Sequence, residues 1–172
     1  MNKSWIANGF TAANALFGGL SIMMSISGEY HVAAICILIA MAADAFDGRV
    51  ARALGTAGPM GVELDSLSDD ISFGVAAGAL MYSYQLRELG AFGFVPCALL
   101  GAFCAFRLAR FNVKVTSVHG YFEGLPCPTV GVIIACYVLS GVKIWNWLAM
   151  VCVLALAVLM LSSASVFSFF AQ

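Results

Sequence analysis

Charge is what this sequence has least of. Only 10% of its 172 residues are charged, whereas 62% are hydrophobic, and the formal net charge is −1. A typical soluble domain is about 25% charged. The chain therefore has too few charged residues to build a surface that faces water on all sides. The net charge by itself points to no class of partner, and no nucleic-acid partner is expected.

The chain also lacks the cysteine spacing of a zinc site or of a disulfide framework. Its six cysteines are scattered, with no C-x-x-C pair and no histidine near them. This distribution is typical of cysteines that act as small apolar residues inside helices. A cleaved signal peptide is not expected either, because residues 2–9 are short and polar and no obvious cleavage site follows the next apolar run.

Long apolar runs dominate what is present. Six stretches are nearly free of charge, namely residues 10–27, 31–43, 71–84, 91–106, 129–142 and 147–161. A helix that crosses a bilayer needs roughly 20 mostly apolar residues, and several of these runs reach that length with their flanks. The pattern predicts an all-α integral membrane bundle of about six transmembrane helices. Without a repeat or a linker, residues 1–172 are expected to form a single domain.

Basic residues gather on one side of this predicted topology. Six spans place on that side Lys3, Arg49, Arg52, Arg107, Arg110 and Lys114, and on the other side only Arg87 and Lys143. Lysine and arginine are enriched in cytoplasmic connections of membrane proteins. We therefore expect a multi-pass protein of the cytoplasmic membrane, with the basic side and any site near it facing the cytoplasm.

Acidic residues are concentrated in one window, "DAFDGRVARALGTAGPMGVELDSLSDD" (residues 44–70), which holds five aspartates and one glutamate. A helical period of 3.6 residues aligns these side chains on two faces, one before and one after the Gly/Pro turn. The first face consists of Asp44, Asp47, Gly48, Ala51 and Arg52. The second consists of Gly61, Asp65, Asp69 and Ser72, whereas Asp70 points elsewhere. Two antiparallel helices would bring four carboxylates together.

Converging carboxylates favour a divalent-metal site. Oxygen ligands suit Mg²⁺, Mn²⁺ or Ca²⁺, and no histidine or cysteine lies near enough in the sequence to favour zinc. Asp44, Asp47, Asp65 and Asp69 would hold two divalent cations, which is the usual equipment for phosphoryl chemistry. The small residues leave room for a ligand, and Arg52 suits a phosphate. The alternatives are close helix packing for the small residues and a solvated acidic helix end for the whole set.

The spacing Asp44-x-x-Asp47-Gly48-x-x-Ala51-Arg52, eight residues, Gly61-x-x-x-Asp65-x-x-x-Asp69 resembles the signature of the CDP-alcohol phosphatidyltransferase family. Further segments are similar to the phosphatidylserine synthase branch of that family. They are "NGFTAANALFGG", "ELDSLSDDISFG", "FRLARFNV" and "FEGLPCP". Two features depart from the branch: Asp70 stands at a place that is more often apolar, and Ser165 and Phe170 stand where relatives often carry an arginine and a lysine.

The resemblance implies a six-helix enzyme, usually a homodimer, surrounded by membrane lipids. It would transfer a phosphatidyl group from CDP-diacylglycerol to the hydroxyl of L-serine and release CMP, with two divalent cations (Mg²⁺ or Mn²⁺). Asp44, Asp47 and Asp65 would ligate metal, and Asp69 would be the catalytic general base and share a metal. The residues implied at the CDP moiety are Asn8, Thr11, Gly48, Ala51, Arg52 and Gly61.

A second cluster offers cations for the acceptor. Arg107, Arg110 and Lys114 share a helical face, and Asn112 lies in the same stretch, so these residues are candidates for binding the serine carboxylate or a lipid phosphate. The alternative for them is a positive-inside anchor.

Three other functions stay open at this point. One is the same chemistry with glycerol 3-phosphate, inositol phosphate or another alcohol, although the few basic residues favour an acceptor without a phosphate. Another is a family member that has lost activity, against which the intact motif argues. The third is a divalent-cation transporter, which would need acidic or polar groups through the whole depth of the bilayer.

Overall fold

The computed structural model describes residues 4–54, 58–115 and 125–162. These ranges are helical apart from short connections and contain no strand, so the all-α prediction is confirmed. The elements in chain order are α1 (Ser4–Ile26), α2 (Tyr30–Leu54), α3 (Pro59–Asp69), η1 (Asp70–Val75), α4 (Ala76–Tyr84), η2 (Leu86–Leu89), α5 (Ala91–Val115), α6 (Cys127–Leu139) and α7 (Asn146–Leu161). Because α3, η1 and α4 follow one another without a break, they form a single rod.

Several helices have an apolar composition that suits a membrane. Within the described residues, three contain segments long and apolar enough to cross a bilayer, Asn8–Ile26, Tyr30–Val50 and Ala91–Val113, and α6 and α7 are shorter apolar helices. Large apolar side chains face outward, including Phe92 (68% exposed) and Phe106 (71% exposed). Lipid accommodates such side chains where water would not. The chain is a membrane protein.

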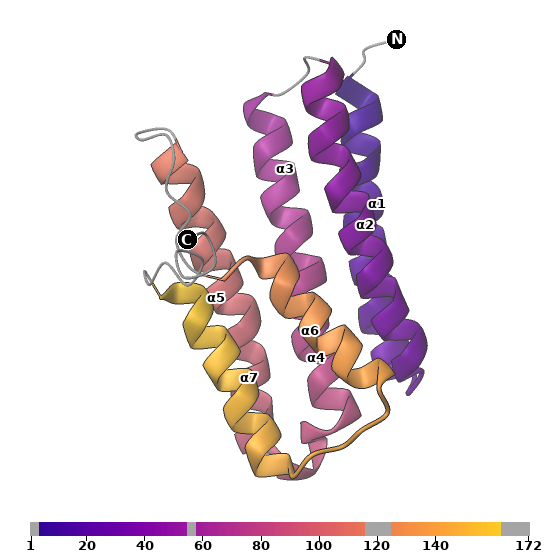
Figure 1. The fold of residues 1–172 in the computed structure, drawn as a ribbon, viewed down its shortest axis with the longest axis vertical. Helices are drawn as coiled ribbons and strands as arrows, with labels where there is room; N and C mark the ends of the chain where they lie inside the picture. The colour runs from indigo at the N-terminus through magenta and orange to yellow at the C-terminus, as the bar shows by residue number, and fades with distance from the viewer. Residues whose placement is uncertain (1–3, 55–57, 116–124, 163–172) are drawn as a thin grey trace, which may run out of the picture.

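The helix ends and connections fall into two groups, one at each end of the bundle. Figure 1 shows the N-terminal end of α1, the C-terminal end of α2, the N-terminal end of α3 and the C-terminal end of α5 at its upper end. The connections from α1 to α2 and from α6 to α7 lie at the lower end, where Gly28 (φ +85°) and Gly141 (φ +68°) adopt left-handed backbone conformations. The motif therefore lies toward the end that carries Arg107 and Arg110, as the basic-residue pattern predicts.

The rod α3–η1–α4 contains a turn of π-helix immediately after Asp69. The backbone stays right-handed through the joint, with φ −63° at Asp69 and φ −67° at Ala76. The sequence predicts the span but not this turn, because its angular count assumes a constant 3.6 residues per turn. π-Turns inside α-helices often occur at functional sites, since the extra residue re-aims the side chains that follow.

Glycines of α1, of α6 and of the π-turn itself allow neighbouring helices to approach this π-turn. A Cβ at Gly18 of α1 would lie 2.3 Å from Ser72 Oγ, and one at Gly131 of α6 would lie 2.7 Å from Phe73 Cδ1. Within η1 itself, a Cβ at Gly74 would lie 2.9 Å from Cys104 Cβ of α5. The segment after Asp69 is thus enclosed by α1, α5 and α6, and its position is fixed by close backbone packing.

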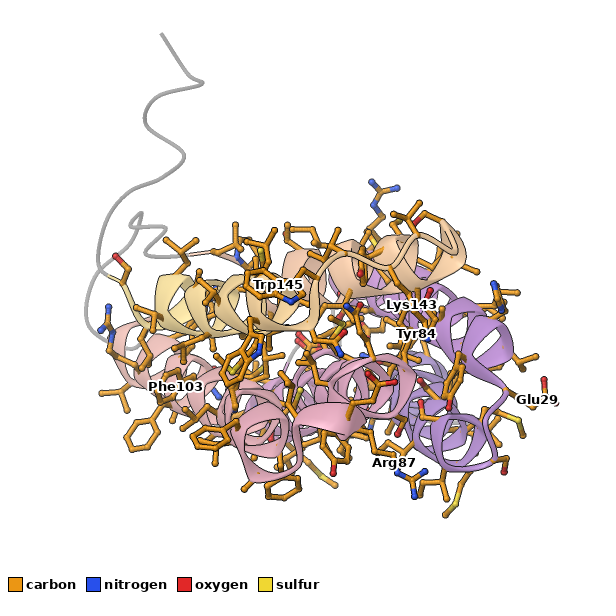
Figure 2. All side chains as sticks on the ribbon, turned by 90° about the horizontal axis from the view of Figure 1, so that it is seen from below. Glu29, Tyr84, Arg87, Phe103, Lys143 and Trp145 are labelled. Atoms are coloured by element: carbon orange, nitrogen blue, oxygen red, sulfur yellow. The ribbon has the colours of Figure 1, made fainter. Side chains whose placement is uncertain are left out.

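The lower end is fastened by polar contacts around Gln85, which is only 4% exposed. Its Nε2 donates to the backbone oxygen of Ile144 and, at 3.1 Å, to Asn146 Oδ1, while the Tyr137 hydroxyl donates to its Oε1. Figure 2 views this end, where Lys143 Nζ lies 4.7 Å from the centre of the Tyr84 ring. These contacts join the connection after α4 to the one between α6 and α7.

Neighbouring glycines of α1 provide a matched test of the packing. We expect Gly18→Ala to lower the stability of the detergent-solubilised protein by about 1–3 kcal/mol, the usual cost of overpacking. Gly19→Ala should leave it unchanged or raise it slightly, because a Cβ there meets nothing within 4 Å and alanine favours a helix. Thermal unfolding followed by circular dichroism measures both, and equal melting temperatures would contradict the described contact between α1 and η1.

Candidate active site

Three motif aspartates come together between two helices. Asp44 and Asp47 are one turn apart on α2, Asp65 lies on α3, and one carboxylate oxygen from each lies within 4.8 Å of the others. Asp47 is 5% exposed, and the other two are half-buried. The helical periodicity of the two motif halves therefore predicts this convergence correctly.

Asp69 lies beside this cluster, one turn further along α3. The Asp44 carboxyl group is within hydrogen-bonding reach of both Asp65 and Asp69. Asp69 is 8% exposed, so it is more deeply enclosed than Asp44 and Asp65. Asp70 points away, toward α5, where it accepts a hydrogen bond from the Cys104 thiol. The sequence prediction that Asp70 leaves the acidic face is confirmed.

Helix α1 supplies one hydrogen bond to each acidic helix. The side chain of Thr11 hydrogen-bonds to Asp47 of α2. Asn14 Nδ2 donates to Asp69 Oδ1 of α3 at 3.1 Å, and Asn14 is fully buried. Since α1 packs along both α2 and α3, it acts as the common support of the two halves of the motif.

Asn14 is a site residue that the sequence analysis missed, although the sequence contains a signal for it. On the apolar helix α1, the polar residues Thr11, Asn14, Ser21 and Ser25 are spaced at three, seven and four residues. At 100° per residue these four lie within a sector of about 80°. All four are buried in the structure. A polar stripe along a membrane span marks the side that faces the bundle interior.

The acidic cluster fits a hard divalent cation. Its donors are carboxylate oxygens alone, and Asp47 Oδ2 and Asp65 Oδ1 are buried without a hydrogen-bond partner among the described residues. Buried acceptors without partners are costly, and a cation coordinated by them would remove that cost. The arrangement is therefore suited to hold a hard divalent cation.

The small motif residues leave space next to this cluster. A Cβ at Gly61 would meet nothing within 4 Å among the described residues, so packing against them does not require glycine there. Gly48 is half-buried on the acidic stretch of α2, and Asn8 is half-buried near the start of α1. The side chains of Ala51 and Arg52 lie outside the described residues. Open space at Gly61 favours room for a ligand over close helix packing.

The basic residues of α5 occupy different surroundings. Arg107 Nη1 donates to Cys127 Sγ of α6 at 3.4 Å, and its Nε is buried with no partner in the described part of the chain. Arg110 is exposed. Asn112 Nδ2 donates to Ser66 Oγ at 3.0 Å and so links α5 to α3 beside Asp65. The side chain of Lys114, like Ser165 and Phe170, lies outside the described residues.

The cysteines only partly follow the sequence prediction. Four are buried, whereas Cys136 and Cys152 are exposed, and all six are free thiols. Cys104 and Cys127 take part in polar contacts as well as packing. Their side chains contact each other, Cys104 contacts Asp70, and Cys127 contacts Arg107. Residues distant in sequence make these contacts, which is why spacing along the chain gives no sign of them.

The model of the CDP-alcohol phosphatidyltransferase family matches residues 4–162, which include the aspartates, Asn14 and the basic stretch of α5. The chain belongs to this family. The match covers nearly the whole chain, so the membership does not depend on the motif alone.

Several curated relatives of this chain have names that include serine. A CDP-diacylglycerol–serine O-phosphatidyltransferase of Helicobacter pylori is 37% identical over 79% of this chain and 58% of its own length. One from Bacillus subtilis is 38% identical over 70% of this chain and 68% of its own. An archaetidylserine synthase of Methanothermobacter thermautotrophicus is 40% identical over 87% and 64%. The chain thus spans about 58% of the length of the Helicobacter protein that it matches.

Replacing one of the clustered aspartates should weaken metal binding. We expect Asp65→Asn to lower the affinity for Mn²⁺ at least 10-fold, because loss even of a ligand's supporting partner costs about 10–100-fold. Asp70→Asn is the matched control, since Asp70 faces Cys104, and it should bind Mn²⁺ like the unmodified protein. Electron paramagnetic resonance of free Mn²⁺ measures both affinities, and an equal loss in the two variants would contradict the assignment of the cluster.

Proposed function

We propose that this protein transfers the phosphatidyl group of CDP-diacylglycerol to the hydroxyl of L-serine, giving phosphatidylserine and CMP. The observation that carries the proposal is the convergence of Asp44, Asp47 and Asp65 beside Asp69, in a chain of the CDP-alcohol phosphatidyltransferase family. The choice of serine is supported by relatives named as serine O-phosphatidyltransferases. Residues 1–172 act as a single domain in this proposal.

Four aspartates hold two divalent cations, Mg²⁺ or Mn²⁺, in the proposed enzyme. CDP-alcohol phosphatidyltransferases generally depend on divalent metals. Asp44, Asp47 and Asp65 have the geometry of a shared site, and Asp69 joins it through its contact with Asp44. When bound, the cations neutralise the diphosphate and stabilise CMP as a leaving group.

Asp69 serves as the general base. A serine hydroxyl is a poor nucleophile until a positioned group accepts its proton. In the proposed step that proton passes to the Asp69 carboxylate while the serine oxygen bonds to the phosphorus that carries diacylglycerol. The bond from this phosphorus to the CMP oxygen breaks. The deep enclosure of Asp69 supports this role, since it keeps bulk water away from the proton acceptor.

The nucleotide half of CDP-diacylglycerol lies over the small residues of the motif. Gly48, Ala51 and Gly61 give it room, Arg52 pairs with a phosphate, and Asn8 lies toward the nucleotide. The open space above Gly61 supports this location. Thr11 is also assigned to the nucleotide site, and its hydrogen bond to Asp47 supports a position close to the metal site.

Serine binds between α3, α5 and α6 in the proposal. Its carboxylate pairs with Arg107, whose buried Nε has no partner among the described residues and is therefore available to an anion. Asn112 assists from the same helix beside Asp65. Arg110 and Lys114 lie nearer the C-terminal end of α5. They are assigned to the serine carboxylate or a lipid phosphate.

The site faces the cytoplasm from a multi-pass protein of the cytoplasmic membrane. The distribution of Lys and Arg supports this orientation. Arg49 is near the C-terminal end of α2, and Arg107 and Arg110 are in the C-terminal part of α5. Both of these helix ends lie at the top in Figure 1. The acyl chains of the substrate then remain among the helices, while cytidine and serine arrive from water. A homodimer is part of the proposal on the strength of the family resemblance.

A direct assay tests the acceptor. Radiolabelled serine with CDP-diacylglycerol and Mn²⁺ should give labelled phosphatidylserine and an equal amount of CMP. A lipid product from glycerol 3-phosphate or inositol phosphate, with none from serine, would replace serine as the acceptor. Flux of Mn²⁺ into proteoliposomes without any nucleotide dependence would instead support a transporter. No reaction with any of these acceptors would indicate a member of the family that has lost activity.

Arg107 gives a prediction about serine binding. We expect Arg107→Gln to raise the KM for serine about 10-fold or more, because a lost hydrogen bond to a charged group costs about 1.5–3 kcal/mol. The KM for CDP-diacylglycerol should change little. Arg87→Gln, an exposed arginine at the opposite end, is the matched control. Initial rates over both substrate concentrations give the two constants, and a change confined to CDP-diacylglycerol would assign Arg107 to the lipid substrate.

A further inference from the structure

We propose that Asn14 is a positioning residue for Asp69, fixing one carboxylate oxygen so that the other faces the acceptor hydroxyl. This inference rests on the proposed function, because it concerns the base of that reaction. Asn14 lies outside the aspartate motif and is contributed by a different helix, so its role comes from the geometry of the site alone.

The hydrogen bond between Asn14 and Asp69 is buried away from water. Asn14 is 0% exposed, and its Nδ2 lies 3.1 Å from Asp69 Oδ1. An ionised carboxylate only accepts hydrogen bonds, which fixes the amide nitrogen as the atom that faces it. A hydrogen bond between a neutral amide and a charged group inside an apolar bundle is stronger than one in water. Asp69 also lies within hydrogen-bonding reach of Asp44, but Asn14 supplies a neutral donor to it.

The backbone around Asn14 is held as firmly as its side chain. Ser72 Oγ donates to the backbone oxygen of Asn14 at 2.9 Å, and Gly18, one turn further along α1, lies against Ser72. Asp69 and Ser72 flank the start of the π-turn on the same rod. Two hydrogen bonds and one close glycine contact thus set the register of α1 against the segment that carries the base.

An amide suits this position for a chemical reason. It donates to a carboxylate but does not itself accept a proton near neutral pH, so it cannot compete with Asp69 as a base. A hydrogen bond to Oδ1 also stops the carboxylate from rotating, which leaves Oδ2 as the oxygen that receives the serine proton. Correct orientation of a catalytic group contributes directly to the rate of the chemical step.

The structure argues against a purely structural role for Asn14. A buried asparagine in an apolar helix that served packing alone would have both polar atoms satisfied by backbone or neutral groups. Here Asn14 Oδ1 has no partner among the described residues, while Nδ2 is spent on the one aspartate assigned to proton transfer. The buried oxygen stays unpaired because the side chain is oriented to direct its nitrogen at Asp69.

Kinetics of two Asn14 variants test the proposal. Asn14→Asp keeps the shape but removes the N–H donor, and Asn14→Leu removes both polar atoms. We expect kcat to fall about 10–100-fold, as it does when the partner that orients a site ligand is lost. The KM values for serine and CDP-diacylglycerol should stay nearly unchanged, because the interaction acts on the chemical step. Ser21→Ala, another buried polar residue of α1, is the matched control and should keep the full kcat.

A residue exchange separates the contact from general stability. Asp69→Asn removes the proposed base and should abolish turnover while Mn²⁺ and CDP-diacylglycerol still bind. The double variant Asn14→Asp with Asp69→Asn restores an amide–carboxylate pair in reverse. It should regain the thermal stability lost in Asn14→Asp alone and remain inactive. The comparison of the two melting temperatures can be made even if Asn14→Asp is too unstable for kinetic measurements.

Each remaining outcome has a defined meaning. If the unmodified protein makes no lipid product from serine, the proposed function is wrong. If that protein is active and both Asn14 variants keep its kcat, only the role of Asn14 is wrong. A rise in the KM for CDP-diacylglycerol at constant kcat would make Asn14 a substrate ligand instead. A double variant no more stable than Asn14→Asp would show that the two side chains do not form the inferred pair.

Discussion

The structure depends on keeping four carboxylates together inside an apolar helical bundle. Like charges at this separation repel one another, and burial away from water strengthens the repulsion. The chain meets this constraint by distributing the aspartates over two helices and supporting them from a third. Thr11 and Asn14 of α1 each hydrogen-bond to one of these carboxylates, Asp47 on α2 and Asp69 on α3. Asp47 and Asp65 each keep one buried oxygen without a partner among the described residues, and both belong to the group that could hold a cation.

Close packing around the π-turn serves the same constraint. Gly18, Gly74 and Gly131 let α1, α5 and α6 approach the residues that follow Asp69, and the approach is too tight for any larger side chain. A carboxylate on a loosely packed helix end would turn toward water or toward the nearest cation. One on a segment enclosed from three sides keeps its direction whether or not metal and substrate are bound. Preorganisation of this kind is the main way in which a site of charged groups lowers a reaction barrier.

Periodicity was sufficient to predict the parts of the site that lie on one regular helix. Asp44 and Asp47 share a face because they are one turn apart, and Asp65 meets them because the turn at Pro59 reverses the chain. The helical rods of the described residues follow in the same way from the long apolar runs. The π-turn could not be predicted, since it changes the period on which the count is based. Contacts such as Asn14 with Asp69 were also missed, because they depend on how α1 packs against α3, which no local pattern specifies.

The two ends of the bundle are built for different tasks, and the difference bears on how the reaction is confined. The lower end is closed by direct hydrogen bonds through Gln85, Tyr137 and Asn146, so its helices are joined to one another. The acidic end has an open space at Gly61 and a buried Arg107 nitrogen with no partner among the described residues. In the proposed function, the substrate reaches the aspartates from the acidic end of the bundle. Its acyl chains then stay among the helices while its diphosphate lies at the aspartates.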